Sequence, residues 1–173
     1  MPAAIPSDRA PAEPDAFIDC AGLRLPLYRF DTVTSTMDVA RELAAKGCAS
    51  WAAITADTQT TGRGTRGRSW ASHAGKGLWL SAILPPPDDP EALSGLTVAI
   101  ADILAGVLRE FADLPYAVKH PNDLTVGGRK LAGILVETTM DGTSVGSVIL
   151  GLGLNLRQRA EDFAEDNLPD ATS

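Results

Sequence analysis

The sequence predicts an α+β fold in which helices pack on a mixed, largely antiparallel β-sheet. Short apolar runs of strand length occur at residues 25–30, 51–56, 78–84, 116–119, 131–139 and 144–156. Gly127-Gly128 and Asp141-Gly142 fall between the last three runs and indicate tight turns. Longer segments with helical periodicity connect other runs. Strands that pair through hairpins, together with helical connections, imply a mixed sheet.

Two segments carry helix signals. In TSTMDVARELAAKG, which starts at Thr34, Ser35 and Asp38 have the spacing of a capping box, and Gly47 stands where a helix would end. From residue 90 to about residue 113, apolar residues recur at intervals of three and four, after a proline at a favoured first-turn position. This pattern predicts one long helix that faces the core.

Length and composition indicate one soluble globular domain. The chain has 173 residues, of which 45% are hydrophobic and 21% charged. Residues 1–24 are predicted to form a flexible Pro/Ala-rich tail, and residues 25–173 the domain. No run approaches the roughly 20 apolar residues of a bilayer span, and the N-terminus lacks a signal-peptide pattern. We therefore expect a cytoplasmic protein without membrane contact. Cys20 and Cys48 have no disulfide or zinc spacing and are expected to be free thiols.

The charge is unevenly distributed. The chain has 15 basic and 22 acidic residues, for a net charge of −7. Residues 57–79 nevertheless carry four cations against one carboxylate, and residues 119–130 carry three cations against one. Such an acidic chain repels nucleic acid at long range, whereas two short basic segments can focus on a small anion. The distribution predicts a compact, negatively charged ligand.

The stretch GRGTRGRSW, residues 62–70, allows several interpretations. GRGTRG matches the GxGxxG pattern of dinucleotide-binding loops, but the following residues, with many Gly and Ser, do not open the helix that such a loop requires. An RG-rich RNA-binding box is usually repeated in disordered chain, whereas this single copy lies between two apolar strands. A solvated loop with incidental arginines is the ordinary alternative.

Four other segments have both an ordinary and a functional interpretation. TSTM (34–37) places hydroxyls at a helix start, where they can cap the helix or bind a polar ligand. KHPND (119–123) contains Pro-Asn-Asp, which is common in turns, together with the basic residue Lys119. GRKLAGILVE (128–137) puts a lysine at the mouth of a strand, where most lysines are solvated. GLGLN (151–155) has two strand glycines, which weaken a sheet unless something approaches the backbone closely.

Together these five segments resemble the catalytic domain of biotin–protein ligases, also called biotin–[acetyl-CoA-carboxylase] ligases. The family pattern is Ser-Thr-Asn at the first helix, GRGRxGRxW, KWPND, a GRKLAGILVE-like strand and GxGxN, in the order found here between residues 32 and 156. The resemblance implies the biotin/lipoate ligase catalytic-domain fold, which is class II synthetase-like. It also implies that biotin and MgATP form biotinyl-5′-AMP, from which biotin passes to a lysine of a biotin carboxyl carrier protein.

The implied chemistry accounts for the residue types. The biotin carboxylate must approach the α-phosphate of ATP, and both groups are anions. Cationic donors and Mg²⁺ therefore have to offset their repulsion. Glycines let a loop close over the ligand, and arginine forks suit phosphate oxygens.

The resemblance also implies a role for individual residues. The implied catalytic residues are Lys130, which would contact the biotin carboxylate and the developing phosphate charge, and Arg63. The implied biotin-binding residues are Ser35, Thr36, Met37, Gln59, Gly62, Arg63, Gly64, Thr65, Lys130, Gly133 and Gly153. The implied ATP-binding residues are Arg66, Arg68, Trp70, Lys119, Asn122, Asp123 and Asn155, and Asp123 is also the implied magnesium ligand.

Three residues depart from the family pattern. Thr65 replaces an arginine, His120 replaces the tryptophan of KWPND, and Met37 replaces an asparagine. The cation missing at Thr65 predicts a loop that retains biotinyl-AMP less tightly.

The resemblance covers the catalytic domain without the family's further C-terminal helices, its small SH3-like domain or the N-terminal DNA-binding domain of repressor-type members. No DNA partner is therefore expected, and a homodimer is left open. A module that binds biotin or biotinyl-AMP without full ligase activity is one alternative. A lipoate–protein ligase is another, disfavoured because its RRxSGGGxVxHD signature is absent.

Overall fold

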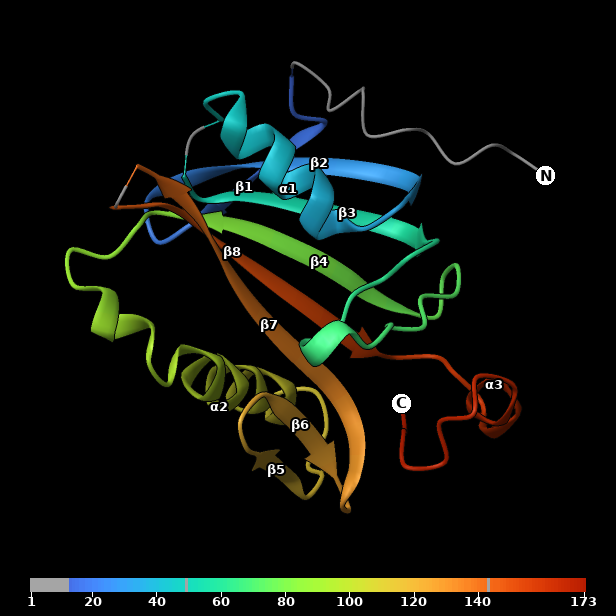
Figure 1. Cartoon of the computed structure of the whole chain (residues 1–173). Helices are drawn as coiled ribbons and strands as arrows, with labels where there is room; N and C mark the ends of the chain where they lie inside the picture. Colours follow the sequence, from blue (N-terminus) through green and yellow to red (C-terminus); the bar gives the residue numbers. More distant parts are fainter. Residues whose placement is uncertain (1–12, 49, 143) are drawn as a thin grey trace.

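A computed structural model describes residues 13–48, 50–142 and 144–173. In this part of the chain, eight strands form one sheet in the order β1-β2-β3-β4-β8-β7-β6-β5 (Figure 1). The strands are β1 (Ala16–Cys20), β2 (Leu23–Val33), β3 (Ala52–Gln59), β4 (Gly77–Leu84), β5 (Tyr116–Lys119), β6 (Asp123–Val126), β7 (Arg129–Asp141) and β8 (Ser144–Asn155). Only β2 and β3 pair in parallel. The predicted mixed, largely antiparallel sheet is confirmed.

Helices cover both faces of this sheet. They are α1 (Thr36–Ala45), α2 (Leu96–Arg109) and the short α3 (Ala160–Glu165), with 3₁₀ turns at Thr65–Gly67 and Pro90–Leu93. Figure 1 shows α1 above β2 and β3, and α2 below the sheet beside β5, β6 and β7. None of the described helices is long and apolar enough to cross a membrane.

Each sheet face has its own apolar core, because successive strand side chains point to opposite faces. On one face, Val39 and Leu43 of α1 pack with Ile54, Ile83 and Ile149. On the other face, α2 packs over a second cluster, whose members include Ala105, Leu124, Leu131, Ala132 and Leu154. Burying each large aliphatic side chain stabilises the fold by about 1.5–3 kcal/mol. The two cores hold the sheet between α1 and α2.

The N-terminal part of the sheet starts earlier than predicted. The sequence predicts a flexible tail that includes residues 16–24, but β1 pairs with β2 through a two-residue turn at Ala21 and Gly22, whose φ values are 50° and 79°. Two residues with positive φ make the turn that suits the twist of a hairpin. Residues 1–12 of the predicted tail lie outside the described residues.

The region between residues 90 and 126 also differs from the prediction. The single long helix is divided, because Gly95 adopts φ 79° between the 3₁₀ turn and α2. The strand β6 was missed. It has only four residues, and its first residue, Asp123, is the last residue of KHPND, a segment whose residue types indicate a turn.

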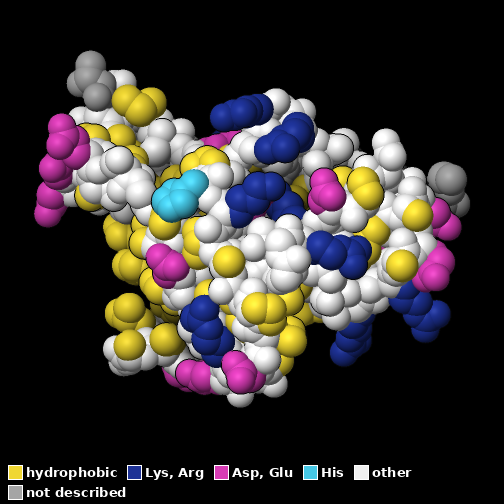
Figure 2. Space-filling view, turned by 90° about the horizontal axis from the view of Figure 1, so that it is seen from below, with side chains coloured by type: hydrophobic (Ala, Val, Ile, Leu, Met, Phe, Trp, Pro, Cys, Tyr) yellow, Lys and Arg dark blue, Asp and Glu magenta, His cyan; other side chains and the backbone are white. Residues whose placement is uncertain are grey.

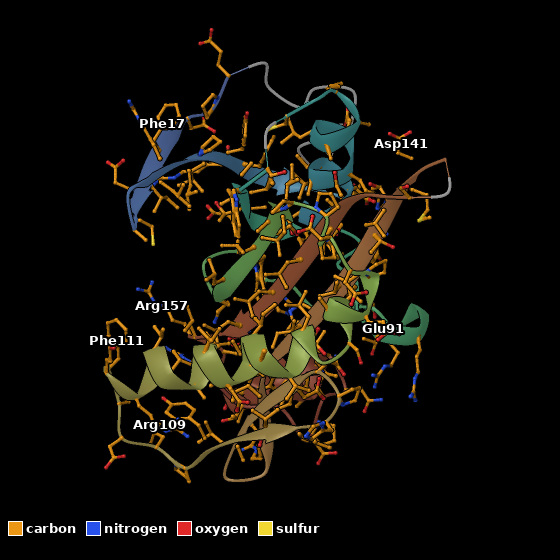
Figure 3. All side chains as sticks on the ribbon, turned by 90° about the vertical axis from the view of Figure 1, so that its left-hand side faces the viewer. Phe17, Glu91, Arg109, Phe111, Asp141 and Arg157 are labelled. Carbon is orange, nitrogen blue, oxygen red and sulfur yellow. The ribbon has the colours of Figure 1, made fainter. Side chains whose placement is uncertain are left out.

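The outer surface of α2 remains exposed. Figure 3 shows α2 crossing the near side of the molecule, with Phe111 projecting beyond its C-terminal end. Phe111 is 82% exposed and Ile103 is 66% exposed.

Gly106→Ala is expected to stabilise the protein by about 0.5–1 kcal/mol, since glycine in a helix interior is less favourable than alanine. Gly106 lies within α2, and a Cβ there would meet nothing within 4 Å. Urea unfolding of the variant measures the change. Gly95→Ala is the matched control and should destabilise the fold, because Gly95 has φ 79°. A lower stability of Gly106→Ala would contradict the expectation.

Candidate functional site

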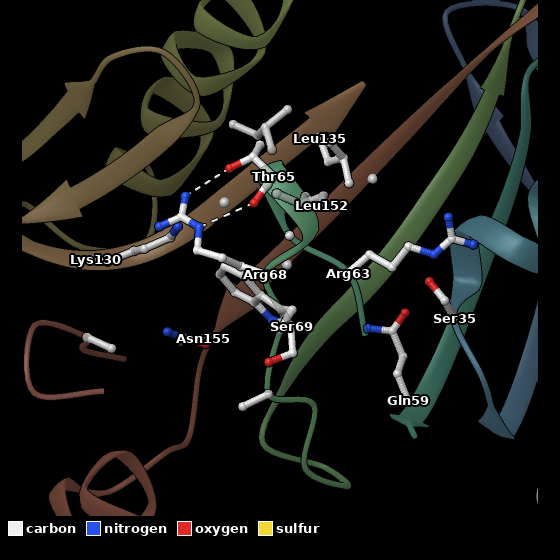
Figure 4. A pocket seen from close by; sticks show the side chains of 18 of the residues that line it. Ser35, Gln59, Arg63, Thr65, Arg68, Ser69, Lys130, Leu135, Leu152 and Asn155 are labelled. Carbon is white, nitrogen blue, oxygen red and sulfur yellow. Dashed lines mark hydrogen bonds between the residues drawn. The ribbon is translucent and has the colours of Figure 1, made fainter. Parts of the chain in front are cut away.

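A cavity of about 200 Å³ lies on the α1 face of the sheet (Figure 4). Its walls come from the start of α1, the end of β3, the segment 62–70, strands β7 and β8, and the segment after β8. We call residues 62–70 the Gly/Arg loop. The predicted site residues that line the cavity are Ser35, Thr36, Met37, Gln59, Arg63, Gly64, Thr65, Arg68, Trp70, Asn122, Lys130, Gly133, Gly153 and Asn155. Segments far apart in the sequence thus meet at one cavity.

Four predicted site residues do not line this cavity. Gly62 is buried and borders a neighbouring groove, and a Cβ on it would lie 2.4 Å from the backbone oxygen of Trp70. Arg66 is exposed and lines a separate groove on the outer side of the Gly/Arg loop. Lys119 is exposed on β5, and Asp123 lies on β6 beside Lys130.

The α1 end of the cavity is a network of buried polar side chains. Gln59 Oε1 accepts hydrogen bonds from the backbone N–H and the hydroxyl of Thr36, at 2.9 and 3.2 Å. The Thr36 hydroxyl also lies 2.8 Å from the Ser81 hydroxyl, and Gln59 Nε2 donates to Ser72 Oγ at 2.8 Å. The Ser35 hydroxyl caps α1 by accepting from the backbone N–H two residues on. Among the described residues, the Ser35 hydroxyl proton and the second Gln59 amide proton have no acceptor, so both can serve a polar ligand.

Trp70 fills the floor of the cavity. Gly133 and Gly153 are paired across β7 and β8, and a Cβ on them would lie 2.6 and 2.4 Å from the Trp70 indole. The glycines thus let the ring lie flat on the sheet. The indole N–H is buried without an acceptor in the described part of the chain. That these glycines leave room for a ligand stays a prediction, because here the room holds Trp70.

Lys130 stands at the opposite end of the cavity from α1. Its ammonium lies 2.7 Å from Asp123 Oδ1 and 5.1 Å from the centre of the Trp70 ring, a cation–π geometry. Its backbone N–H donates to the Asp170 carbonyl at 2.6 Å, and its carbonyl accepts from Thr172 at 2.8 Å. Both the ammonium and the backbone of Lys130 are therefore fixed in place.

The segment after β8 forms a wall of the cavity that the sequence did not predict. Phe163, Asp166 and Leu168 line the cavity from α3 and the residues after it. Lys76 binds Asp162 at 3.0 Å, which holds α3 against the residues before β4.

The Asp162 carboxylate also accepts from the backbone N–H of Arg159. That bond, with the Lys76 ammonium, lowers the pKa of Asp162 below its ordinary 3.8. This contribution to stability is present above pH 3.8 and is lost as the pH falls through the lowered pKa.

Further lining residues were not predicted, and most of them belong to apolar strands or to the C-terminal wall, whereas Ser69 and Ala71 lie in or directly after the Gly/Arg loop. They are Ser69, Ala71, Leu80, Ile134, Leu135, Gly151, Leu152, Gln158, Phe163, Asp166, Leu168 and Ala171. The period of two in a strand could have found Leu135 and Gly151, two positions from Gly133 and Gly153. No local pattern marks the C-terminal wall.

Arg63 points to the α1 end of the cavity. Figure 4 shows its guanidinium near Ser35, whereas Lys130 lies at the far side of the cavity. Arg63 forms ion pairs with Asp38 and, at 3.7 Å, with Glu137. The predicted capping box is not formed, since the Asp38 carboxylate turns to arginines. The two predicted catalytic cations share one cavity but do not converge on one point in it.

Several cations of the two predicted basic segments are paired with carboxylates in the structure: Arg63 with Asp38 and Glu137, Lys76 with Asp162, and Lys130 with Asp123. In the face seen from below, several Lys and Arg side chains gather near the middle, and most Asp and Glu side chains lie toward the edges (Figure 2).

The predicted magnesium ligand is Asp123, and the structure shows what surrounds it. No group of three or more His, Cys, Asp or Glu side chains is placed for a metal ion in the described ranges. Asp123 lies outside the cavity lining and its carboxylate already binds Lys130. Magnesium is commonly held by one or two carboxylates with substrate phosphates. A role of Asp123 as its ligand stays a prediction.

Comparison with known proteins decides the family. The model described as "Biotin/lipoate A/B protein ligase family" matches residues 29–155, which include the lining residues from α1 to the end of β8. The chain belongs to this family. The predicted biotin/lipoate ligase fold is thereby confirmed, and solved biotin protein ligases agree with it.

Relatives in the biotin/lipoate ligase family include two bacterial proteins. "Bifunctional ligase/repressor BirA" of Bacillus subtilis is 36% identical over 147 residues, which are 85% of this chain and 45% of that protein. "Biotin--[acetyl-CoA-carboxylase] ligase" of Mycobacterium tuberculosis is 36% identical over 124 residues, which are 69% of this chain and 43% of that protein. The chain thus spans less than half the length of these relatives.

Two solved family members have the same fold. The biotin protein ligase of Aquifex aeolicus in complex with biotin and ATP has a TM-score of 0.61 and 30% identity, over 85% of this chain and 58% of that one. The Leishmania major enzyme in complex with biotinyl-5-AMP has a TM-score of 0.61 and 28% identity, over 81% of this chain and 65% of that one.

Proposed function

We propose that this chain is a biotin–protein ligase that binds biotin and ATP in the cavity and forms biotinyl-5′-AMP. The observation that carries the proposal is the cavity itself, which joins a buried hydroxyl–amide network at one end to the Lys130 ammonium at the other. A ligand with a polar uncharged head and an anionic tail fits this arrangement. The solved relatives bound to biotin, ATP and biotinyl-5-AMP support the same assignment.

In the first proposed step, a carboxylate oxygen of biotin attacks the α-phosphorus of ATP and pyrophosphate leaves. Ser35 and Gln59 hold the ureido ring by the two protons that have no acceptor among the described residues. Lys130 offsets the charge where carboxylate and phosphate meet, since a fixed cation stabilises charge that develops in the transition state. The apolar side chain of Leu135, on the same face of β7 as Gly133, suits the valeryl chain.

In the second proposed step, the amine of a carrier-protein lysine attacks the acyl carbon, loses a proton and displaces AMP. We propose a biotin carboxyl carrier protein as the acceptor. ATP would bring magnesium on its phosphates, and the further ATP contacts proposed for the chain are Arg66, Arg68, Trp70, Lys119, Asn122, Asp123 and Asn155.

The decisive experiment measures biotin-dependent pyrophosphate release with MgATP, beside biotin binding by calorimetry. A ligase binds biotin and releases pyrophosphate, and it labels a carrier protein when one is added. Binding without pyrophosphate release would leave a biotin-binding module and overturn the proposal. Lipoate that outcompetes biotin in the same assay would instead indicate a lipoate–protein ligase.

Thr65→Arg is expected to slow the release of biotinyl-AMP by about tenfold, because a charge-assisted hydrogen bond contributes roughly 1.5–3 kcal/mol. Thr65 lines the cavity, and its hydroxyl accepts from Arg68 at 2.9 Å (Figure 4). Thr65→Val is the matched control, since it removes that acceptor without adding a cation. Release of bound biotinyl-AMP during dilution measures the rate. A Thr65→Arg variant that releases it as fast as the original chain would contradict this expectation.

A further inference from the structure

Four charged side chains form a closed group beside the cavity. Arg41 of α1 donates to Asp38 at 3.1 Å and to Glu137 of β7 at 2.8 Å. Arg63 of the Gly/Arg loop forms ion pairs with the same Oδ1 of Asp38 and the same Oε2 of Glu137. The Thr34 hydroxyl donates to the other Asp38 oxygen at 3.3 Å. We call Arg41, Arg63, Asp38 and Glu137 the charge quartet.

The two arginines of the charge quartet differ in what holds them. Arg41 is part of α1, whose apolar face is buried in the core, so its backbone is fixed. Arg63 belongs to a loop with glycines on both sides of it, and only Arg63 lines the cavity. Because Arg41 bridges both carboxylates by itself, they remain paired if Arg63 moves away.

We propose that Asp38, Glu137 and Arg41 are positioning residues. They keep Arg63 ion-paired beside α1 when no ligand is bound, and they release it to the anionic group of the ligand when one binds. This rests on the proposed function, in which that group is the biotin carboxylate. Asp38 and Glu137 attract Arg63 to the α1 side of the cavity. Arg41 lowers the cost of its departure, since a carboxylate left without any counter-ion in a partly buried site is unfavourable.

The proposal predicts opposite effects from two substitutions. Asp38→Asn weakens the hold on Arg63, so Arg63 reaches a ligand anion more readily. Arg41→Gln leaves Arg63 as the sole counter-ion of two carboxylates, so Arg63 is held more firmly. A quartet that only joins α1 to β7 would change the binding of charged and neutral ligands alike.

The test compares biotin, an anion at neutral pH, with biotinamide, its neutral analogue, by calorimetry. We expect the ratio of the Kd for biotinamide to the Kd for biotin to rise about threefold to tenfold in Asp38→Asn and to fall similarly in Arg41→Gln, since a charge-assisted hydrogen bond to the ligand is strong but is weakened by solvent screening at this half-exposed site. Glu42→Gln is the matched control, because Glu42 is on the same helix and pairs with exposed Lys46 instead. Its ratio should equal that of the original chain.

Asp38→Asn could change ligand binding either by releasing Arg63 or by its own change of charge near the ligand. An Arg63→Met background distinguishes the two effects. In that background, Asp38→Asn should no longer change the ratio, because the two residues act as one unit. A change that persists would show that Asp38 acts by its own charge and would overturn the proposal. Thermal melting of each variant checks that it folds.

A second measurement needs no ligand. Trypsin cleaves after arginines, so cleavage after Arg63 should become about threefold faster in Asp38→Asn and slower in Arg41→Gln, because proteolysis follows the population of the open form. Unchanged cleavage in both variants would overturn the inference. A chain that shows these cleavage changes but does not bind biotin would instead refute the proposed function alone.

Discussion

Lys130→Met should lower the rate of biotinyl-AMP formation by about 100- to 1,000-fold, the usual effect of removing a fixed donor from a site of developing charge. The Lys130 ammonium is held by Asp123 at 2.7 Å and by the face of Trp70, and its backbone is tied to the C-terminal segment. Methionine keeps most of the side-chain volume and removes the ammonium group, with its charge and its N–H donors. Single-turnover formation of biotinyl-AMP measures the rate.

The controls separate the chemistry from stability. Asp123 is 18% exposed in this ion pair, so its carboxylate loses a partner in the variant and the melting temperature should fall somewhat. Lys46→Met removes a lysine that is 53% exposed and should leave the rate unchanged. A Lys130→Met rate within threefold of the original, in a folded variant, would rule out the proposed role of Lys130.

Gly153→Ala should displace Trp70 and weaken ATP use by about tenfold or more. The added Cβ would lie 2.4 Å from Cε2 and 2.6 Å from Nε1 of the indole, which is closer than atoms in contact allow. Trp70 also makes an edge contact with the buried Trp79, with ring centres 6.4 Å apart, and cannot shift without losing it. Overpacking of this kind costs about 1–3 kcal/mol. The kcat/KM for ATP and urea unfolding measure the two effects.

Gly146→Ala gives the matched comparison on the same strand. There the nearest atom to an added Cβ is Thr139 Oγ1 at 3.2 Å, a side-chain atom that can rotate away. Its effect on ATP use should be negligible. If Gly153→Ala kept full activity and stability, the position of Trp70 would not depend on a glycine at residue 153.

Several elements were predictable because their signals are local. The runs at residues 78–84 and 116–119 form β4 and β5, and the glycine turn at Gly127 and Gly128 joins β6 to β7. Strand length, periodicity and positive-φ turns depend on near neighbours in the chain. The failures were also local in origin, since Gly95 divides a periodic helix and β6 has few residues to show a pattern.

The candidate site was predicted mainly from the order of the five family motifs along the chain. Ser35, Thr36 and Gln59 do lie together at one end of the cavity, and Lys130 at the other. The sequence did not show that Ser72 and Ser81 orient Gln59 and Thr36, because those hydrogen bonds join residues 13 to 45 positions apart.

The sequence by itself determined the mixed sheet, the family and most of the residues that line the cavity, since periodicity, turn residues and motif order are written along the chain. Only the tertiary structure decided which partner each charge takes. Arg63 binds the carboxylates of Asp38 and Glu137, although the latter is more than 70 residues away, and Lys130 binds Asp123. Ion pairing depends on distance in space and on burial, and neither can be read from positions in the sequence.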